Sequence, residues 1–174
     1  MGYSLGFPNE EVRQALYNVV LPALTMRDSG YIVSLQSLLY RQLGTGMTDD
    51  AMKTLRSLIA DVPYSNKKLA SMNMEERYRL IISTILNAIG IRVEVEKMIA
   101  TGRIDLVAST RRYIYVMELK LSNNGGTDSA AKQIVERKYL EPFAADNRCV
   151  TGIAVELDEE GRGLLGWQIV DLRD

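Results

Sequence analysis

Two carboxylates and a lysine are spaced in this sequence in a way that could support metal-assisted chemistry. Asp105 lies in one short apolar run, Ile104–Ala108, and Glu118 and Lys120 lie in the next, Tyr113–Leu121. Glu118 and Lys120 are two residues apart, so on a strand their side chains share a face. The surrounding residues are apolar, and a buried carboxylate or ammonium group is costly unless it is paired or has a functional role.

A hairpin between these two runs would bring Asp105 to Glu118. If the turn is centred on Arg111 and Arg112, the numbers of paired residues sum to 223 and Asp105 faces Glu118. Directly opposed side chains have β-carbons ~5 Å apart, and two carboxylates at that separation repel each other. A divalent cation removes this conflict, because Mg²⁺ binds one or two carboxylates together with water and phosphate oxygens. The prediction depends on the register, since a slip of one residue moves Asp105 to the other face.

This arrangement predicts a metal site of the kind used to hydrolyse phosphodiester bonds. Asp105 and Glu118 would hold a metal that polarises the phosphate and lowers the pKa of a bound water. Lys120 would stabilise charge on the phosphate, or position or deprotonate the attacking water. In the helix expected next, Gln133 and Arg137 are four residues apart and therefore share a face, which could also contribute.

Simpler interpretations exist for each residue taken alone. A Glu-x-Lys pair is commonly a surface ion pair, and Asp105 could be a solvated residue of an edge strand. Gln133 could be a solvated residue of its helix. In the purely structural alternative, Asp105 forms a salt bridge with Lys120 or Arg103.

Composition excludes several other kinds of chemistry. The chain of 174 residues has no histidine, which excludes imidazole-dependent triads and histidine-based zinc sites. It has one cysteine, so no internal disulfide can form, and it has no glycine-rich phosphate loop. No apolar stretch approaches the ~18 residues of a membrane span, and we expect a cytoplasmic protein with no membrane association. The formal net charge of -1 gives no global attraction to nucleic acid.

The apolar pattern predicts a helical N-terminal part followed by a mixed part. The expected helices of the first part are Glu10–Leu24, Tyr31–Leu43 and Thr48–Ile59, and Asp61–Asn73 is expected to be a connector. We place the boundary between residues 64 and 65, with 1–64 as a helical extension and 65–174 as the main domain.

The second part alternates between helix and strand patterns. The expected elements are a helix over Met74–Ile89 ended by Gly90, strands over Ile91–Val95, Ile104–Ala108 and Tyr113–Leu121, a helix over Asp128–Leu140 ended by Pro142, and strands over Val150–Leu157 and Leu164–Val170. The strand Tyr113–Leu121 is apolar on both faces away from its two charged residues, as in a central strand covered by helices on both sides. We therefore predict an α/β or α+β fold.

The region Gly102–Tyr139 resembles the PD-(D/E)XK nuclease superfamily. The likeness lies in Gly102-Arg103-Ile104-Asp105-Leu106, Tyr113-Ile114-Tyr115-Val116-Met117-Glu118-Leu119-Lys120, Ala131-Lys132-Gln133-Ile134 and Lys138-Tyr139. It is nearest to a nuclease-like domain that follows an AAA-ATPase-like domain in bacterial proteins, and Tyr3–Val12 resembles the junction after that ATPase domain. The resemblance implies an α/β, restriction-endonuclease-like core, a Mg²⁺ (or Mn²⁺) cofactor, a nucleic-acid substrate, expected to be DNA, and an AAA-ATPase-like domain in cis.

The resemblance also assigns residues. It gives the metal and catalytic roles to Asp105, Glu118 and Lys120. Gln133 and Tyr139 resemble a glutamine and a tyrosine of RecB-like members, although their spacing is longer here, and Arg103 is a further supporting candidate.

The first helix of the domain is less clear. The superfamily often supplies an acid from it, for which Glu75 and Glu76 compete, and periodicity favours Glu75. Arg79 stands where related sequences often have glutamine.

Three functions fit these observations. The first is a Mg²⁺-dependent nuclease. The second is a non-catalytic module of the same fold that binds nucleic acid or protein, with Glu10–Ile59 as the interaction surface. The third is a structural domain that serves the ATPase.

Overall fold

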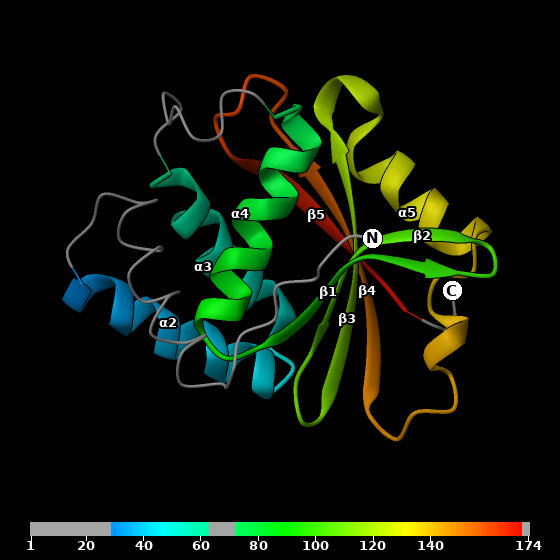
Figure 1. Cartoon of the computed structure of the whole chain (residues 1–174), viewed down its shortest axis with the longest axis horizontal. Coiled ribbons are helices and arrows are strands. Elements are labelled where there is room, and N and C mark those ends of the chain that lie inside the picture. Colours follow the sequence, from blue (N-terminus) through cyan, green and yellow to red (C-terminus); the bar gives the residue numbers. More distant parts are fainter. Residues whose placement is uncertain (1–28, 63–71, 172–174) are drawn as a thin grey trace, which may run out of the picture.

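The computed structural model describes residues 29–62 and 72–171, which form a five-stranded sheet with helices on both faces (Figure 1). The helix expected over Glu10–Leu24 and the junction-like segment Tyr3–Val12 lie outside the described residues. The elements, in chain order, are α2 (Ser29–Gly44), α3 (Thr48–Ala60), α4 (Met74–Ala88), β1 (Arg92–Ile99), β2 (Gly102–Ser109), β3 (Tyr113–Leu121), α5 (Gly126–Glu136), β4 (Cys149–Leu157) and β5 (Leu164–Val170). The predicted order of helix, three strands, helix and two strands is confirmed.

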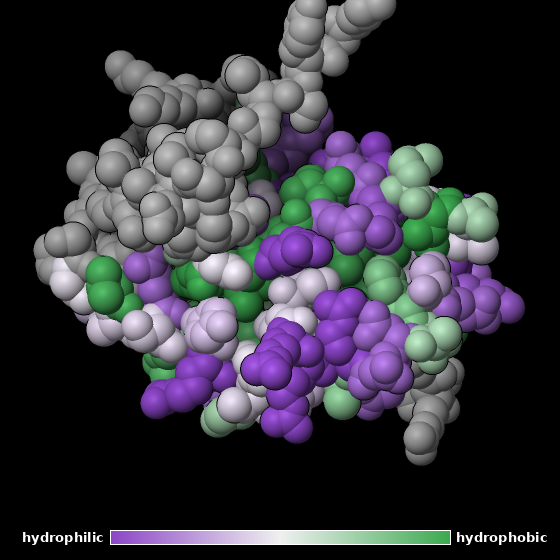
Figure 2. Space-filling model, turned by 60° about the horizontal axis from the view of Figure 1, so that its bottom comes forward, coloured by the Kyte–Doolittle hydropathy of each residue, from purple (hydrophilic) through white to green (hydrophobic). Residues whose placement is uncertain are grey.

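The sheet has the order β1-β2-β3-β4-β5, so β3 is its central strand as predicted. All neighbouring strands are antiparallel except β3 and β4, which are parallel and are joined through α5. The turn between β2 and β3 lies at the bottom of Figure 1. That end of the sheet comes forward in Figure 2, where hydrophilic side chains gather across the lower centre of the surface.

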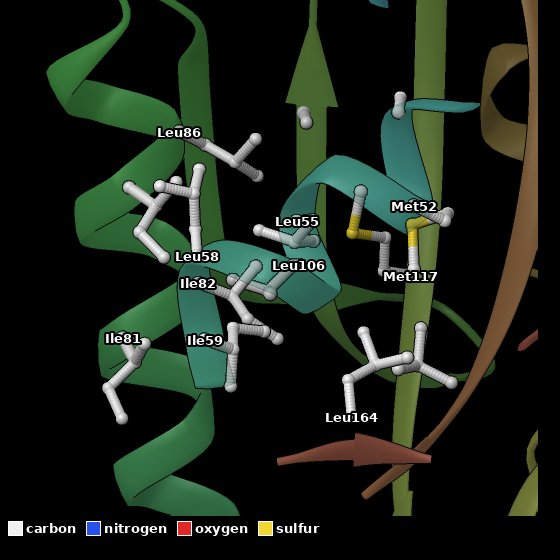
Figure 3. Close-up of a cluster of buried hydrophobic side chains, with 14 of the residues drawn as sticks. Met52, Leu55, Leu58, Ile59, Ile81, Ile82, Leu86, Leu106, Met117 and Leu164 are labelled. Carbon is white, nitrogen blue, oxygen red and sulfur yellow. The ribbon is translucent and has the colours of Figure 1, made fainter. Parts of the chain in front are cut away.

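A large core fills the space between one face of the sheet and helices α2, α3 and α4 (Figure 3). Leu55 and Leu58 of α3 and Ile82 of α4 lie in it with Leu106 and Met117 of the sheet, and all five are almost fully buried. The helices supply these residues at three- and four-residue spacings, as amphipathic helices do. The N-terminal helices therefore share one core with the sheet.

A smaller core lies under α5 on the opposite face. Ala130 and Ile134 of α5 pack there against Ile114, Val116 and Ala154. The alternation of β3 residues between the two cores directs Glu118 and Lys120 toward the α5 side, because side chains two apart share a face.

Polar contacts at two places position α3 and α4. Trp167 of β5 donates a hydrogen bond from Nε1 to Asp49 of α3 at 2.8 Å, and Arg56 lies 4.6 Å from the centre of the Trp167 ring. Asn73 caps α4, since its side chain accepts the N–H of Glu76 at 2.9 Å. The connector between α3 and α4 lies mostly outside the described residues, so the boundary near residue 65 stays a prediction.

Two element boundaries differ from the prediction by more than two residues. Strand β1 continues to Ile99 instead of ending at Val95. Helix α5 ends at Glu136 rather than at Leu140, because Lys138 adopts a left-handed conformation with φ of 53°. The N–H of Tyr139 then bonds to the carbonyl of Ile134, as in a Schellman helix end.

None of the described helices is both long and apolar enough to cross a membrane.

Candidate metal centre

Asp105 and Glu118 meet at the place where β2 and β3 separate. The pairing Leu106↔Met117 and the pairs that follow it have numbers that sum to 223, so the predicted hairpin register is confirmed for these four pairs. The expected pair of Asp105 with Glu118 is not among them. The regular pairing stops at Leu106. The carboxylate of Asp105 accepts the backbone N–H of Leu119 at 2.9 Å, which holds this side chain against β3.

The turn of this hairpin is held by a threonine. Arg111 and Arg112 are its central residues, and Thr110 donates its N–H to the carbonyl of Tyr113 at 2.9 Å. The Thr110 hydroxyl oxygen accepts the N–H groups of Arg112 and Tyr113 at 3.3 and 2.9 Å. A hydroxyl that bonds the backbone in this way stabilises a turn, so the register does not require glycine or asparagine here.

Glu118 is almost fully buried, at 2% exposure. Its Oε1 accepts hydrogen bonds from Gln133 Nε2 and, at 3.3 Å, from Lys120 Nζ. Its Oε2 is buried and has no hydrogen-bond partner among the described residues. Burial, and then the negative charge of Asp105, raise the pKa of Glu118 to about 7, whereas Lys120 acts in the opposite direction.

An arginine of α4 pairs with Asp105 from the other side of the sheet. Nη2 of Arg79 lies 2.9 Å from Asp105 Oδ1, and Nη1 lies 3.0 Å from Glu96 Oε1. The same Glu96 oxygen lies 3.1 Å from Nη1 of Arg103. Among the described residues the ion-pair partner of Asp105 is therefore Arg79, not Lys120 or Arg103. Arg103 connects to Asp105 through Glu96 and Arg79.

Glu96 is a residue of this site that the sequence patterns did not single out. The pairs Val95↔Leu106 and Lys97↔Ile104 place Glu96 opposite Asp105 across β1 and β2. Its φ of 52° is unusual for a residue other than glycine, and such backbone strain is often found at functional sites. The sequence signal that could have identified Glu96 was a second hairpin, between β1 and β2, which brings this acid beside Asp105.

Helix α5 and the segment that follows it add the two polar residues that the sequence had indicated. Gln133 Nε2, which bonds Glu118, also donates to the hydroxyl of Tyr139 at 3.0 Å. The Tyr139 hydroxyl donates to the carbonyl of Arg103 at 2.8 Å. The helix end at Lys138 is what turns Tyr139 back toward β2. Gln133 and Tyr139 thus form a hydrogen-bonded chain from Glu118 to the backbone of β2.

Other candidates lie outside this network. Arg137 is exposed, and its contacts are with Thr101. Glu75 is half-buried one turn before Arg79, and Glu76 is exposed. Within the part of the chain that the structure describes, no hydrogen bond or ion pair joins Glu75 to Asp105 or Glu118. Its contribution to the site remains a prediction.

The donor set fits a hard divalent cation. Residues 29–62 and 72–171 contain no group of three or more histidine, cysteine, aspartate or glutamate side chains that could hold a metal by themselves. The pair Asp105 and Glu118 could hold Mg²⁺ or Mn²⁺ together with water, because Mg²⁺ retains several waters and needs only one or two carboxylates. Oε2 of Glu118 is buried with no donor from the described part of the chain, and a cation would satisfy this oxygen.

Comparison with known proteins identifies a family. A family model described as the PD-(D/E)XK nuclease superfamily matches residues 73–167. The chain is 25% identical over 180 residues to a protein of Azotobacter chroococcum mcd 1 described as "Uncharacterized protein in vnfD 5'region". This match covers 98% of the chain and 33% of that protein, so the chain spans about a third of its relative's length. No solved structure matches the chain significantly.

The matched region runs from the cap of α4 into β5 and contains the whole network around Asp105 and Glu118. The observed order of helix, three strands, helix and two strands is consistent with a restriction-endonuclease-like fold. Since the family model covers more than half of the chain, the protein belongs to the PD-(D/E)XK nuclease superfamily.

Proposed function

We propose that the protein is a divalent-metal-dependent nuclease that hydrolyses phosphodiester bonds in DNA. The single observation that carries the proposal is Oε2 of Glu118, which is buried beside Asp105 and has no hydrogen-bond partner in residues 29–62 and 72–171. Asp105 pairs with Arg79 and Glu118 with Lys120, and a bound cation would satisfy the buried oxygen of Glu118 that these pairs leave without a donor. Members of the superfamily generally depend on a divalent metal.

Each residue of the network has a distinct role in this proposal. Asp105 and Glu118 hold Mg²⁺ or Mn²⁺, which when bound polarises a phosphate and activates water. Lys120 donates a hydrogen bond to a phosphate oxygen or positions the attacking water, so it stabilises charge that develops in the reaction. Gln133 orients Glu118, and Tyr139 orients Gln133. Such outer residues fix the direction of the metal ligands.

Two arginines complement the carboxylates. Arg79 offsets the charge of Asp105 when no cation is bound, through their 2.9 Å ion pair. Arg103 has a side chain 54% exposed beside the site, where its guanidinium can contact a phosphate of the substrate.

The second candidate function is a non-catalytic module of the same fold that binds nucleic acid or protein. The observation that favours it is the same Arg79–Asp105 ion pair, since a carboxylate that already has a buried partner has less need of a metal. For the whole protein we further propose an AAA-ATPase-like domain in cis, which rests on the resemblance of Tyr3–Val12 to the junction that follows such a domain.

A cleavage assay tests the proposal. Wild type, Lys120→Ala and the control Lys53→Ala are incubated with single-stranded and duplex DNA and RNA in Mg²⁺, Mn²⁺ or EDTA. Lys53 is exposed on α3 and pairs with Asp50. We expect wild type and the control to cut DNA with metal and not with EDTA, and Lys120→Ala to be about 10²–10³-fold slower. If wild type cuts no nucleic acid with either metal, the nuclease proposal is contradicted and the non-catalytic module takes its place.

A further inference from the structure

Five arginines surround a groove at the end of the sheet away from the carboxylates. The groove has a volume of about 790 Å³ and lies between the end of α2, the start of β1, the β2–β3 turn and the segment before β4. This end of the sheet comes forward in Figure 2. The arginines come from four separate segments of the chain and are Arg41, Arg92, Arg111, Arg112 and Arg148.

The groove is strongly positive although the chain as a whole is not. Arg148 is paired with Asp146 at 2.7 Å. The other four arginines are exposed, and their side chains form no hydrogen bond or ion pair with other described residues. The acidic residue at the groove is Glu94, and it is already paired with Lys97. Like charges gathered without counter-ions repel one another, so the cluster favours a negatively charged ligand.

Backbone contacts fix the position of the central arginines. Thr110 holds the two-residue turn that presents Arg111 and Arg112. The carbonyl of Arg112 accepts the N–H of Cys149 at 2.9 Å, and Nη1 of Arg148 donates to the carbonyl of Thr110 at 3.4 Å. The guanidinium groups are thus carried on a scaffold that is ordered before any ligand binds.

We propose that this arginine groove binds the phosphodiester backbone of the nucleic acid at a distance from the position of cleavage. Guanidinium groups form bidentate hydrogen bonds with phosphate. Several of them around one open groove match a polymer of phosphates better than a single small anion. Tyr40, also at the groove, is 55% exposed and offers a ring on which an unpaired base can stack.

The spacing between the groove and the metal centre sets a length for the substrate. Glu118 lies six residues after Arg112, which is about 20 Å along an extended strand. A strand of duplex DNA, with one phosphate every ~3.4 Å, needs at least about six nucleotides to cover this separation. That the ligand is a nucleic acid rests on the proposed function. The groove would hold the substrate at phosphates other than the one that reacts.

The test compares two triple variants with the same change in net charge. The groove variant is Arg92→Gln/Arg111→Gln/Arg112→Gln. The control is Lys53→Gln/Lys132→Gln/Lys138→Gln, whose three lysines are exposed and already ion-paired elsewhere. Binding of labelled single-stranded and duplex DNA is measured by fluorescence anisotropy in EDTA over a series of salt concentrations, after thermal melts have verified that both variants are folded.

We expect the groove variant to bind DNA about tenfold or more weakly than wild type. The slope of the logarithm of affinity against the logarithm of salt concentration should become shallower by about 0.9 for each phosphate that the variant no longer neutralises. The control should retain the affinity of wild type.

Two outcomes would overturn the groove as the binding site for DNA. Equal weakening of both triple variants would show an effect of net charge alone, and unchanged binding by the groove variant would show that the arginines do not contact DNA. An oligoglutamate of matched charge that binds the groove as tightly as DNA would assign it to an acidic protein segment instead.

The cleavage assay separates this proposal from the proposed function. If wild type binds DNA through the groove but cuts nothing in Mg²⁺ or Mn²⁺, the proposed nuclease activity is contradicted and the proposed groove is supported. If wild type cuts DNA and the groove variant binds DNA as tightly as wild type does, only the proposed groove is contradicted. In the outcome we expect, the groove variant has a raised KM and an unchanged kcat.

Discussion

The metal centre and the arginine groove lie toward opposite ends of β3 and manage charge in opposite ways. At the centre, Asp105 and Glu118 are buried, and each has a basic partner, in Arg79 and Lys120 respectively. At the groove, four arginines are exposed and form no ion pair with other described residues. A buried charge must be compensated within the fold, whereas an exposed one is solvated by water until a ligand arrives.

This difference predicts how the two regions respond to mutation. Changes at the centre should alter stability, metal binding and chemistry together, because its groups are packed and mutually bonded. Changes at the groove should alter nucleic-acid affinity alone.

The largest expected effect is on cleavage by Glu118→Gln. This variant keeps the shape of the side chain but removes the charge that holds the cation, which is worth several kcal/mol of transition-state stabilisation, or about 10³-fold in rate. DNA affinity in EDTA should not fall, since the groove is untouched. Initial rates and anisotropy measure the two quantities. A reduction of DNA affinity as large as that of the groove variant would mean that the two regions form one binding surface.

Arg79→Gln should have the next largest effect, on the protein without metal. Removal of one partner of a buried ion pair lowers the free energy of unfolding by about 3–5 kcal/mol, because Asp105 loses its counter-ion. The stabilisation by Mn²⁺ should become larger than in wild type, since a cation then replaces the missing positive charge. Denaturant unfolding in EDTA and in Mn²⁺ measures both.

The control for this variant is Arg103→Gln. Arg103 pairs with Glu96 near the surface, and an exposed pair contributes only about 0–1 kcal/mol. If the two variants were destabilised equally, Arg79 would not be the counter-ion of Asp105 that the structure indicates.

Gln133→Ala should have an intermediate effect on the centre. Loss of a residue that orients a metal ligand typically lowers metal affinity or activity by about 10–100-fold. Glu136→Ala, at an exposed position of the same helix, is the control for changes in helix stability. Titration with Mn²⁺ would argue against a positioning role if both variants bound the metal as wild type does.

Tyr139→Phe should have the smallest effect of the series. It removes the hydroxyl that links Gln133 to the carbonyl of Arg103, at a cost of about 0.5–1.5 kcal/mol in stability. Thermal melts measure this change, and Mn²⁺ titration should show a weaker defect than Gln133→Ala. A stronger defect would place Tyr139, rather than Gln133, in contact with the metal ligands.

Sequence patterns predicted the parts of the molecule that depend on local order. The run Tyr113–Leu121, apolar on both faces, located β3, and the register through the Arg111–Arg112 turn followed from the position of that turn. Both depend on residues within a short stretch of chain. The helix that carries Gln133 was also predicted, but its end was not. The chain adopts a left-handed conformation there at Lys138, whereas the usual sequence signal for such a helix end is a glycine.

Tertiary packing determines what the sequence did not reveal. Arg79 reaches Asp105 because α4 packs across β1, β2 and β3, and no spacing along the chain encodes that contact. The groove arginines are far apart along the chain, from Arg41 to Arg148, and the sequence patterns indicated no cluster of them. A near-zero net charge concealed them, since net charge averages over faces that differ strongly.

Calorimetric titration with Mn²⁺ tests the central claim most directly, that Asp105 and Glu118 hold one divalent cation. Wild type is compared with Asp105→Asn and with the control Asp128→Asn, an exposed residue of α5. We expect one Mn²⁺ site in wild type and in the control, and no measurable site in Asp105→Asn. Where the site is present, Mn²⁺ at a hundredfold excess over Kd should stabilise the fold by about 2.7 kcal/mol. Equal Mn²⁺ binding by wild type and Asp105→Asn, or none by wild type, would contradict the account.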